Sequence, residues 1–181
     1  HGDWSSDVCS SDLAKIVTDM NNSISDNNES NMFVTLIVGI LDLETGKLKL
    51  CNAGHNPPIL IRPDGQVSFL EFKTQIFVGV IEEFAYTEDE TTLEKGSKLF
   101  LYTDGVTEAE NTEKELYGDE KLLKTLSDNN TSDVRTTVNG IEDSVADHVK
   151  EAEASDDLTI LLIQYEPGQQ TIKHISLWKE K

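Results

Sequence analysis

The sequence predicts an α+β fold, in which largely antiparallel sheets are flanked by helices. Short apolar or alternating segments separated by turn residues fill residues 32–103, whereas helical patterns follow over 116–149 and one apolar strand closes the series at 158–165. Runs of strands followed by runs of helices are typical of α+β layers, because βαβ folds alternate the two regularly. The chain of 181 residues is long enough for one domain with a substantial core.

The chain opens with a segment that does not fit this pattern. Residues 1–13 are small and polar without a clear period, so we interpret them as a non-native leader, the alternative being a natural flexible one. A helix is expected next, because apolar residues recur with the spacing of one helical face. These residues are Leu13, Ile16, Val17, Met20 and Ile24. The Asn- and Ser-rich stretch that follows is expected to end the helix.

Strands arranged in hairpins are predicted over the middle of the chain. Residues 32–42 are rich in β-branched residues and predict a buried strand, with Gly39 at a bulge or a close approach. The turn sequences LETGK and RPDGQ each join two strand patterns, and the acids of FAYTEDETTL suit an edge strand. The further strands are predicted over 47–53, 58–62, 66–72, 84–93 and 98–103.

The helical patterns begin after residue 115. Leucines at 116, 122, 123 and 126 predict a short helix, and five apolar residues spaced 4,3,4,4 predict an amphipathic helix over 134–149. Thr131 or Ser132 is the expected N-cap of the second helix. The apolar run LTILLIQY then predicts a strand, and residues 167–181 read as a tail or as the start of a following domain.

The overall charge excludes some partners. The chain has 34 Asp and Glu residues and 15 Lys and Arg residues, which gives a net charge of -19. Because such a chain repels polyanions, neither nucleic acid nor an anionic membrane surface is an expected partner. Cys9 and Cys51 do not suggest a disulfide framework, and Cys51 is expected to be buried. The expected location is therefore the cytoplasm, although a missing N-terminal part could anchor the parent protein to a membrane.

Acidic residues stand at two strand ends. One predicted strand ends in Thr103, Asp104 and Gly105, and Asp156 and Asp157 precede another. If these strands are antiparallel neighbours, their carboxylates converge at one sheet end and could bind Mg²⁺ or Mn²⁺, with Gly105 allowing close approach of the backbone. Neighbouring side chains point to opposite faces of a strand, so one of the paired acids would bind and the other would support it. The structural alternative is a turn Asp at position 104 and a capping Asp at position 156 or 157.

A histidine lies in the turn cluster AGHNPP. His55 could be a ligand or a general acid, or it could be structural together with Asn56. The sequence has no His and Cys spacing typical of zinc, no G-x-S-x-G motif and no phosphate loop.

Four stretches in order carry a family resemblance: MFVTLIVGILDLETG, NAGHNPP, LYTDGVTEAEN and SDDLTILLI. Over residues 14–166 the chain resembles the PPM family of metal-dependent protein serine/threonine phosphatases (protein phosphatase 2C-like), in its bacterial sporulation stage II protein E branch. The resemblance implies a four-layer αββα sandwich with two Mn²⁺ or Mg²⁺ ions, which activate a water to attack phosphoserine or phosphothreonine. It implies no phosphoenzyme intermediate.

The resemblance also assigns roles to residues. Asp104 and Asp156 match metal ligands, Gly105 and Asp157 take supporting roles, and His55 and Asn56 match a structural turn. The implied substrate is a phosphorylated anti-sigma-factor antagonist in a partner-switching circuit, and the implied further domains are a sensor and a kinase-like ATPase.

The sequence departs from the family at two motifs. Neither GGDYYD nor GDVxGHG, which supplies the Asp that bridges the two metals, occurs in it. We therefore expect a domain without its N-terminal strands, which holds at most one metal weakly and is nearly inactive alone. The alternative function is a pseudophosphatase that only docks a protein partner.

Overall fold

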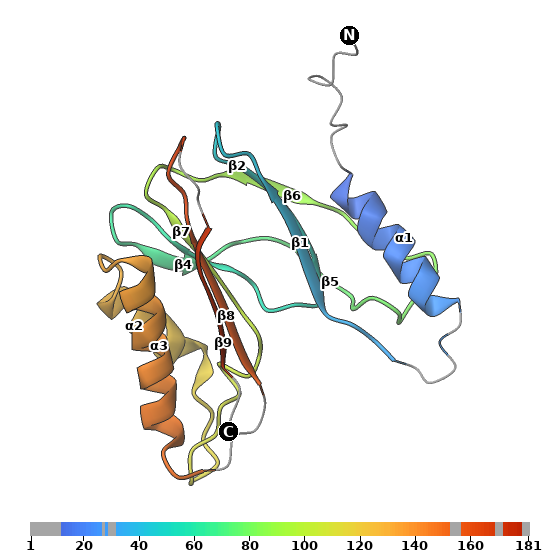
Figure 1. Cartoon of the computed structure of the whole chain (residues 1–181). Coiled ribbons are helices and arrows are strands. Elements are labelled where there is room, and N and C mark those ends of the chain that lie inside the picture. The colour runs from blue at the N-terminus through green and yellow to red at the C-terminus, as the bar shows by residue number, and fades with distance from the viewer. Residues whose placement is uncertain (1–11, 27, 29–31, 153–156, 169–171, 179–181) are drawn as a thin grey trace. The chain divides into compact units, whose positions relative to one another are not determined.

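The structure of the chain is a computed structural model. It describes residues 12–26, 28, 32–152, 157–168 and 172–178, the last range without its side chains. The chain divides into two compact units (Figure 1). Unit 1 comprises residues 1–42, 47–55 and 72–92, and unit 2 comprises residues 43–46, 56–71 and 93–181.

Unit 1 is a mostly antiparallel sheet with one helix. Its elements are α1 (Leu13–Ser25), β1 (Leu36–Leu41), β2 (Lys47–Ala53), β5 (Thr74–Gln75) and β6 (Asp89–Thr92). Strand β2 pairs antiparallel with β1 and with β6, and parallel with β5. The predicted helix and the first hairpin are therefore confirmed. Helix α1 packs on β1 and β2, and the core between them contains Leu13, Val17 and Cys51.

Strand β1 differs from the expectation of a buried strand over 32–42. The strand starts only at Leu36, and Phe33 and Ile40 are 57% and 41% exposed. The physical reason is its position, because β1 is an edge strand that pairs with β2 alone among the described strands. The close approach at Gly39 is confirmed, since a Cβ there would lie 2.3 Å from Leu50 Cδ2.

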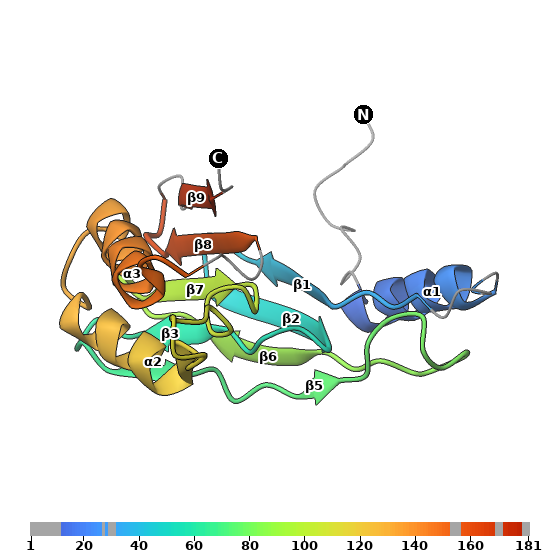
Figure 2. The same cartoon turned by 90° about the horizontal axis from the view of Figure 1, so that it is seen from below.

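Unit 2 is an antiparallel sheet with two helices on it. Its strands lie in the order β4–β3–β7–β8–β9, and α2 packs against α3 and β4 while α3 packs against β8 (Figure 2). The elements are β3 (Ile59–Ile61), β4 (Val67–Phe69), β7 (Lys98–Tyr102), α2 (Gly118–Asp128), α3 (Val134–Val149), β8 (Leu158–Gln164) and β9 (Ile172–Trp178). The predicted hairpin over 58–72 and both helices are confirmed.

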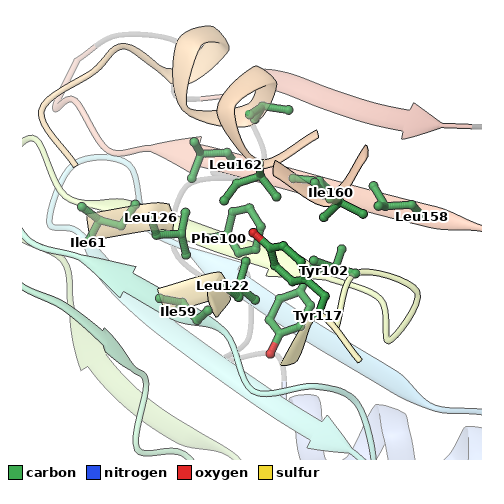
Figure 3. Close-up of a cluster of buried hydrophobic side chains, with 14 of the residues drawn as sticks. Ile59, Ile61, Phe100, Tyr102, Tyr117, Leu122, Leu126, Leu158, Ile160 and Leu162 are labelled. Atoms are coloured by element: carbon green, nitrogen blue, oxygen red, sulfur yellow. The ribbon is translucent and has the colours of Figure 1, made fainter. Parts of the chain in front are cut away.

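The core of unit 2 joins the strands to the helices. Side chains of β3, β7 and β8 meet those of α2 and α3 around Phe100, which is fully buried (Figure 3). Alternate residues of β8 are buried, as a strand with one covered face requires. Leu116, which we predicted to belong to the same short helix as Leu122 and Leu126, precedes α2 and is 54% exposed.

The N-cap of α3 is Asp133, so the expectation of Thr131 or Ser132 was wrong. Its carboxylate accepts hydrogen bonds from the backbone N–H groups of Arg135 and Thr136 and from the Thr136 hydroxyl. These bonds, the Thr136 hydroxyl first, lower the pKa of Asp133. An ionised acid accepts these bonds better than a hydroxyl and also favours the positive end of the helix dipole.

The observed architecture confirms the α+β class with mainly antiparallel sheets. Strand β9 lies within the range 167–181 and pairs with β8 at the edge of the unit 2 sheet. Over the described residues, none of the helices has both the length and the apolar content to cross a bilayer.

Candidate metal site at the ends of β7 and β8

Two strands bring the predicted acidic stretches together within unit 2. Strands β7 and β8 are antiparallel neighbours, and their register ends with Tyr102 opposite Ile160. The end of β7 therefore lies beside the start of β8, as the sequence led us to expect. Asp104 follows the first strand by two residues and is exposed, while Asp157 directly precedes the second.

The backbone at Asp104 is held by a tight turn. Thr103 O accepts from Val106 N at 3.1 Å, and Asp104 O accepts from Glu108 N at 2.8 Å and from the Thr107 hydroxyl at 3.3 Å. The Asp104 carboxylate accepts from Gly105 N at 3.0 Å. Because the carbonyl oxygen is used by the turn, the exposed carboxylate is the group that Asp104 can offer to a ligand.

Gly105 is the point of closest approach between the two strand ends. A Cβ at this position would lie 2.5 Å from Asp157 O, a backbone atom that cannot move aside like the end of a flexible side chain. Only glycine therefore fits here without a shift of the chain. Thr103 is the second link, since its hydroxyl accepts from Thr159 N at 3.1 Å and reaches Asp157 O at 3.4 Å.

Asp104 is the described acidic residue that could bind a divalent cation here. In the turn after β7 it offers a carboxylate oxygen, which is the ligand type that Mg²⁺ and Mn²⁺ prefer. Asp156, the second predicted ligand, lies outside the described residues. Within the described ranges, no three His, Cys, Asp or Glu side chains come together as a metal site.

A buried tyrosine lies directly before the site on β7. Tyr102 is 2% exposed, and its hydroxyl lies near Asn56 and Asp119 without a described partner at hydrogen-bond geometry. Burial, followed by the negative charge of Asp119, raises the pKa of Tyr102 to about 12. The hydroxyl therefore stays protonated at neutral pH.

The predicted structural turn at His55 is stabilised by a side chain that the sequence did not indicate. In unit 1, Asn52 Oδ1 accepts from His55 N at 2.8 Å, and Asn52 Nδ2 donates to His55 O at 2.9 Å. The Thr35 hydroxyl lies 3.5 Å from His55 Nδ1. These contacts support a structural role for His55.

The sequence did not indicate that Thr103 holds the start of β8, nor that Asn52 holds the turn at His55. Each acts through a hydrogen bond to backbone that is distant in the chain or lies within a turn. A threonine at a strand end is common for its β propensity alone, so the sequence had no separate signal for it.

Comparison with known proteins places the chain among relatives of known fold. The sequence profile of the family Stage II sporulation protein E (SpoIIE) matches residues 7–166. Protein IcfG of Synechocystis sp. is 31% identical over 132 residues, which are 73% of this chain and 20% of that protein. The phosphoserine phosphatase RsbU of Bacillus subtilis is 24% identical over 152 residues, which are 83% of this chain and 44% of that protein.

A solved structure shows the same fold. The PP2C domain of SiaA from Pseudomonas aeruginosa matches with a TM-score of 0.73 at 17% identity, over 84% of this chain and 61% of that one. The present chain thus spans less than half the length of IcfG and of RsbU. With a profile match that covers most of its residues, the chain belongs to the Stage II sporulation protein E (SpoIIE) family.

Proposed function

We propose that the protein hydrolyses phosphoserine or phosphothreonine on a signalling protein with the help of divalent metal ions. The observation that carries the proposal is the β7–β8 register, which joins the turn of Asp104 to the backbone of Asp157 at one sheet end. Membership in the SpoIIE family and the likeness to the phosphoserine phosphatase RsbU support the reaction type.

The residues of this sheet end take separate roles in the proposal. Asp104 and Asp156 are metal ligands, Gly105 permits the close approach, and Asp157 supports the second ligand. Bound Mn²⁺ or Mg²⁺ would supply Lewis-acid chemistry that lowers the pKa of a coordinated water and neutralises charge on the phosphoryl group. The chain itself contributes the β7–β8 pairing, which places the turn of Asp104 beside the start of β8.

The substrate in this proposal is a phosphorylated anti-sigma-factor antagonist of a partner-switching circuit in the bacterial cytoplasm. The family resemblance motivates this choice. The chain spans less than half the length of IcfG and of RsbU. In the proposal, the parent protein also contains sensor or kinase-like ATPase domains.

The 181-residue chain alone is expected to turn over substrate poorly, because its sequence contains neither of the family's two other acidic motifs. The test is Mn²⁺-dependent hydrolysis of a phosphoserine peptide by this chain and by a version with grafted N-terminal strands that carry both motifs. We expect activity to rise strongly with the graft. Equal activity of the two proteins would show that the extra motifs are not needed.

The ligand assignment is tested in the grafted version with two matched substitutions. Asp104→Asn removes one charge at the site, and Asp143→Asn removes one charge from an exposed position on α3. Loss of a metal ligand is expected to lower activity at least about tenfold, as outer partners of metal ligands alone cost 10- to 100-fold. Full activity of Asp104→Asn would contradict the assignment.

A further inference from the structure

An exposed apolar patch distinguishes unit 1 from unit 2. Apart from Leu43 and Leu116, every large apolar side chain that is exposed in the described part of the chain belongs to unit 1. Apolar side chains that gather on a surface usually mark a place where another molecule binds. The patch consists of side chains on two short segments, each between 39% and 67% exposed: Met32, Phe33, Val34, Phe77, Val80 and Ile81.

The two segments of the patch lie side by side. Val34 and Val78 exchange both backbone hydrogen bonds at 3.0 Å, and the rings of Phe33 and Phe77 have centroids 5.0 Å apart. The other patch residues lie within three positions of Val34 or Val78 in the sequence. The exposed side chains therefore form one local group.

Two asparagines of α1 hold the backbone of the loop between β5 and β6, which runs along this helix (Figure 1). Asn21 is fully buried, and it accepts from Gly79 N and donates to Ile81 O, both at 2.8 Å. Asn22 Oδ1 accepts from Glu83 N at 3.1 Å. A loop that is fixed in this way loses little conformational freedom when a partner binds to it.

A third asparagine joins this loop to the other segment of the patch. Asn28 Nδ2 donates to Gly79 O at 3.0 Å and to Met32 O at 2.5 Å, and Asn28 Oδ1 accepts from Met32 N at 2.7 Å. Gly79 permits the close approach, since it has a φ of +92° and a Cβ on it would lie 2.9 Å from Met32 O. The relative position of the two segments is thus fixed before any partner arrives.

The charges beside the patch indicate the kind of partner. Residues 16–46 and 74–94 contain no Lys or Arg, and Glu82 and Glu83 follow the patch directly and are exposed. Lys15, Lys47 and Lys49 of unit 1 form ion pairs with acids. With a net charge of -19, the chain repels a second copy of itself and an anionic membrane, whereas it attracts a cationic partner.

We propose that the exposed apolar patch binds a cationic amphipathic helix of a partner protein. The apolar face of such a helix covers the patch, and its Lys or Arg side chains lie beside Glu82 and Glu83. The inference concerns unit 1 and needs no metal site, so it goes beyond the proposed function and is tested without any measurement of phosphatase activity.

The experiment is a fluorescence-anisotropy titration of a labelled peptide with the 181-residue chain. The peptide has about 18 residues, with leucines on one helical face and lysines on the other. A peptide of the same pattern with glutamate in place of lysine is the charge control. We expect the lysine peptide to bind, more weakly as salt is added, and the glutamate peptide not to bind.

The apolar contact is tested with Ile81→Ser and with Leu116→Ser, a matched change at an exposed side chain of unit 2. We expect Ile81→Ser to weaken binding of the lysine peptide about tenfold and Leu116→Ser to stay within about twofold of the unchanged chain. Both side chains are exposed, so both variants are expected to keep the fold, which circular dichroism checks.

The charge contribution is tested with two double variants that remove the same number of acids. Glu82→Gln with Glu83→Gln changes the acids beside the patch, and Glu113→Gln with Glu120→Gln changes two exposed acids of unit 2. Only the first pair is expected to weaken binding, by about fivefold. Equal losses in the two pairs would assign the attraction to net charge alone and would overturn the inference.

Three other results would also overturn it. Equal affinity of Ile81→Ser and Leu116→Ser would show that the peptide binds elsewhere. A dimer in analytical ultracentrifugation that Ile81→Ser dissociates would assign the patch to a second copy of the chain. Loss of peptide binding in the version with grafted N-terminal strands would show that the domain itself covers the patch.

Discussion

Aromatic side chains lie in different surroundings in the two units. In unit 2, Phe100 is fully buried at the centre of a core that β3, β7, β8, α2 and α3 share. In unit 1, Phe33 and Phe77 contact one another with ring centroids 5.0 Å apart, yet they are 57% and 39% exposed. The turn of Asp104 thus starts from a strand whose side chains are anchored in a closed core, and this anchoring would limit the movement of the proposed metal ligand.

The largest expected difference between the units concerns these phenyl rings. Phe100→Ala removes a fully buried ring and is expected to lower the free energy of unfolding by about 3–5 kcal/mol. Phe33→Ala removes an exposed ring and is expected to cost less than about 1 kcal/mol. Urea unfolding followed by circular dichroism measures both. Equal losses would show that the apolar surface of unit 1 is covered in solution.

A second comparison concerns two glycines at close contacts. Gly105→Ala would place a methyl group against Asp157 O in unit 2 and is expected to cost about 1–3 kcal/mol. Gly39→Ala in unit 1 meets mainly Leu50 Cδ2, the end of a flexible side chain that can rotate, so its cost is expected to be smaller. Thermal unfolding of both variants ranks them. A larger loss for Gly39→Ala would contradict the rigidity assigned to the strand ends of the site.

A third comparison uses the first residues of two strands. Lys98 of β7 is buried and donates from Nζ to the carbonyl oxygens of Asn130 and Ser132, whereas Lys47 of β2 forms an exposed ion pair with Glu90 at 2.9 Å. Burial lowers the pKa of Lys98. Lys98→Met is expected to cost about 1–2 kcal/mol, because two carbonyls lose their donor. Lys47→Met is expected to cost about 0–1 kcal/mol.

The check is the urea midpoint of both lysine variants at pH 7. The loop between α2 and α3 should also exchange its amide hydrogens faster in Lys98→Met, because Nζ holds two of its carbonyls. A stability loss confined to Lys47→Met would show that Lys98 does not stabilise this loop.

The smallest expected effect concerns the helix caps. Asp133 of unit 2 accepts two backbone N–H bonds and one hydroxyl bond, whereas Asp12 caps α1 of unit 1 through one bond from Lys15 N. Asp133→Ala should therefore lower Tm more than Asp12→Ala. Because the folded-state pKa of Asp133 lies below its usual 3.8, its contribution is present above that pH and is lost as the pH falls through the folded value.

The pH series provides the control for this last comparison. At pH 7 the difference in Tm between Asp133→Ala and the unchanged chain should be fully present, and it should shrink in strongly acidic solution. A difference that stays constant with pH would show that the ionised carboxylate of Asp133 is not the cause of the effect.

Local patterns explain why much of the fold could be predicted from the sequence. The turn residues LETGK and RPDGQ predicted both hairpins, and the apolar spacing predicted α1, α2 and α3. The neighbouring antiparallel placement of β7 and β8 was a conditional expectation, which the register confirms. These features depend on residues close in sequence or on the apolar character of whole strands.

Features set by distant contacts could not be predicted. The apolar run over 32–42 looks like a buried strand, but its edge position depends on which strands pair with it. The role of the Thr103 hydroxyl depends on the carbonyl of the same residue being used by a turn, which only the register reveals. The choice of Asp133 over its polar neighbours as N-cap likewise depends on the backbone angles at that residue.

The most direct test of the account is Mn²⁺ binding to the 181-residue chain, measured by calorimetry for the unchanged protein and for Asp104→Asn, Asp156→Asn and Asp143→Asn. We predict that the first two substitutions each abolish or strongly weaken binding, while Asp143→Asn, the exposed control on α3, leaves it unchanged. Binding that is equal in all four proteins would contradict a metal site at the ends of β7 and β8.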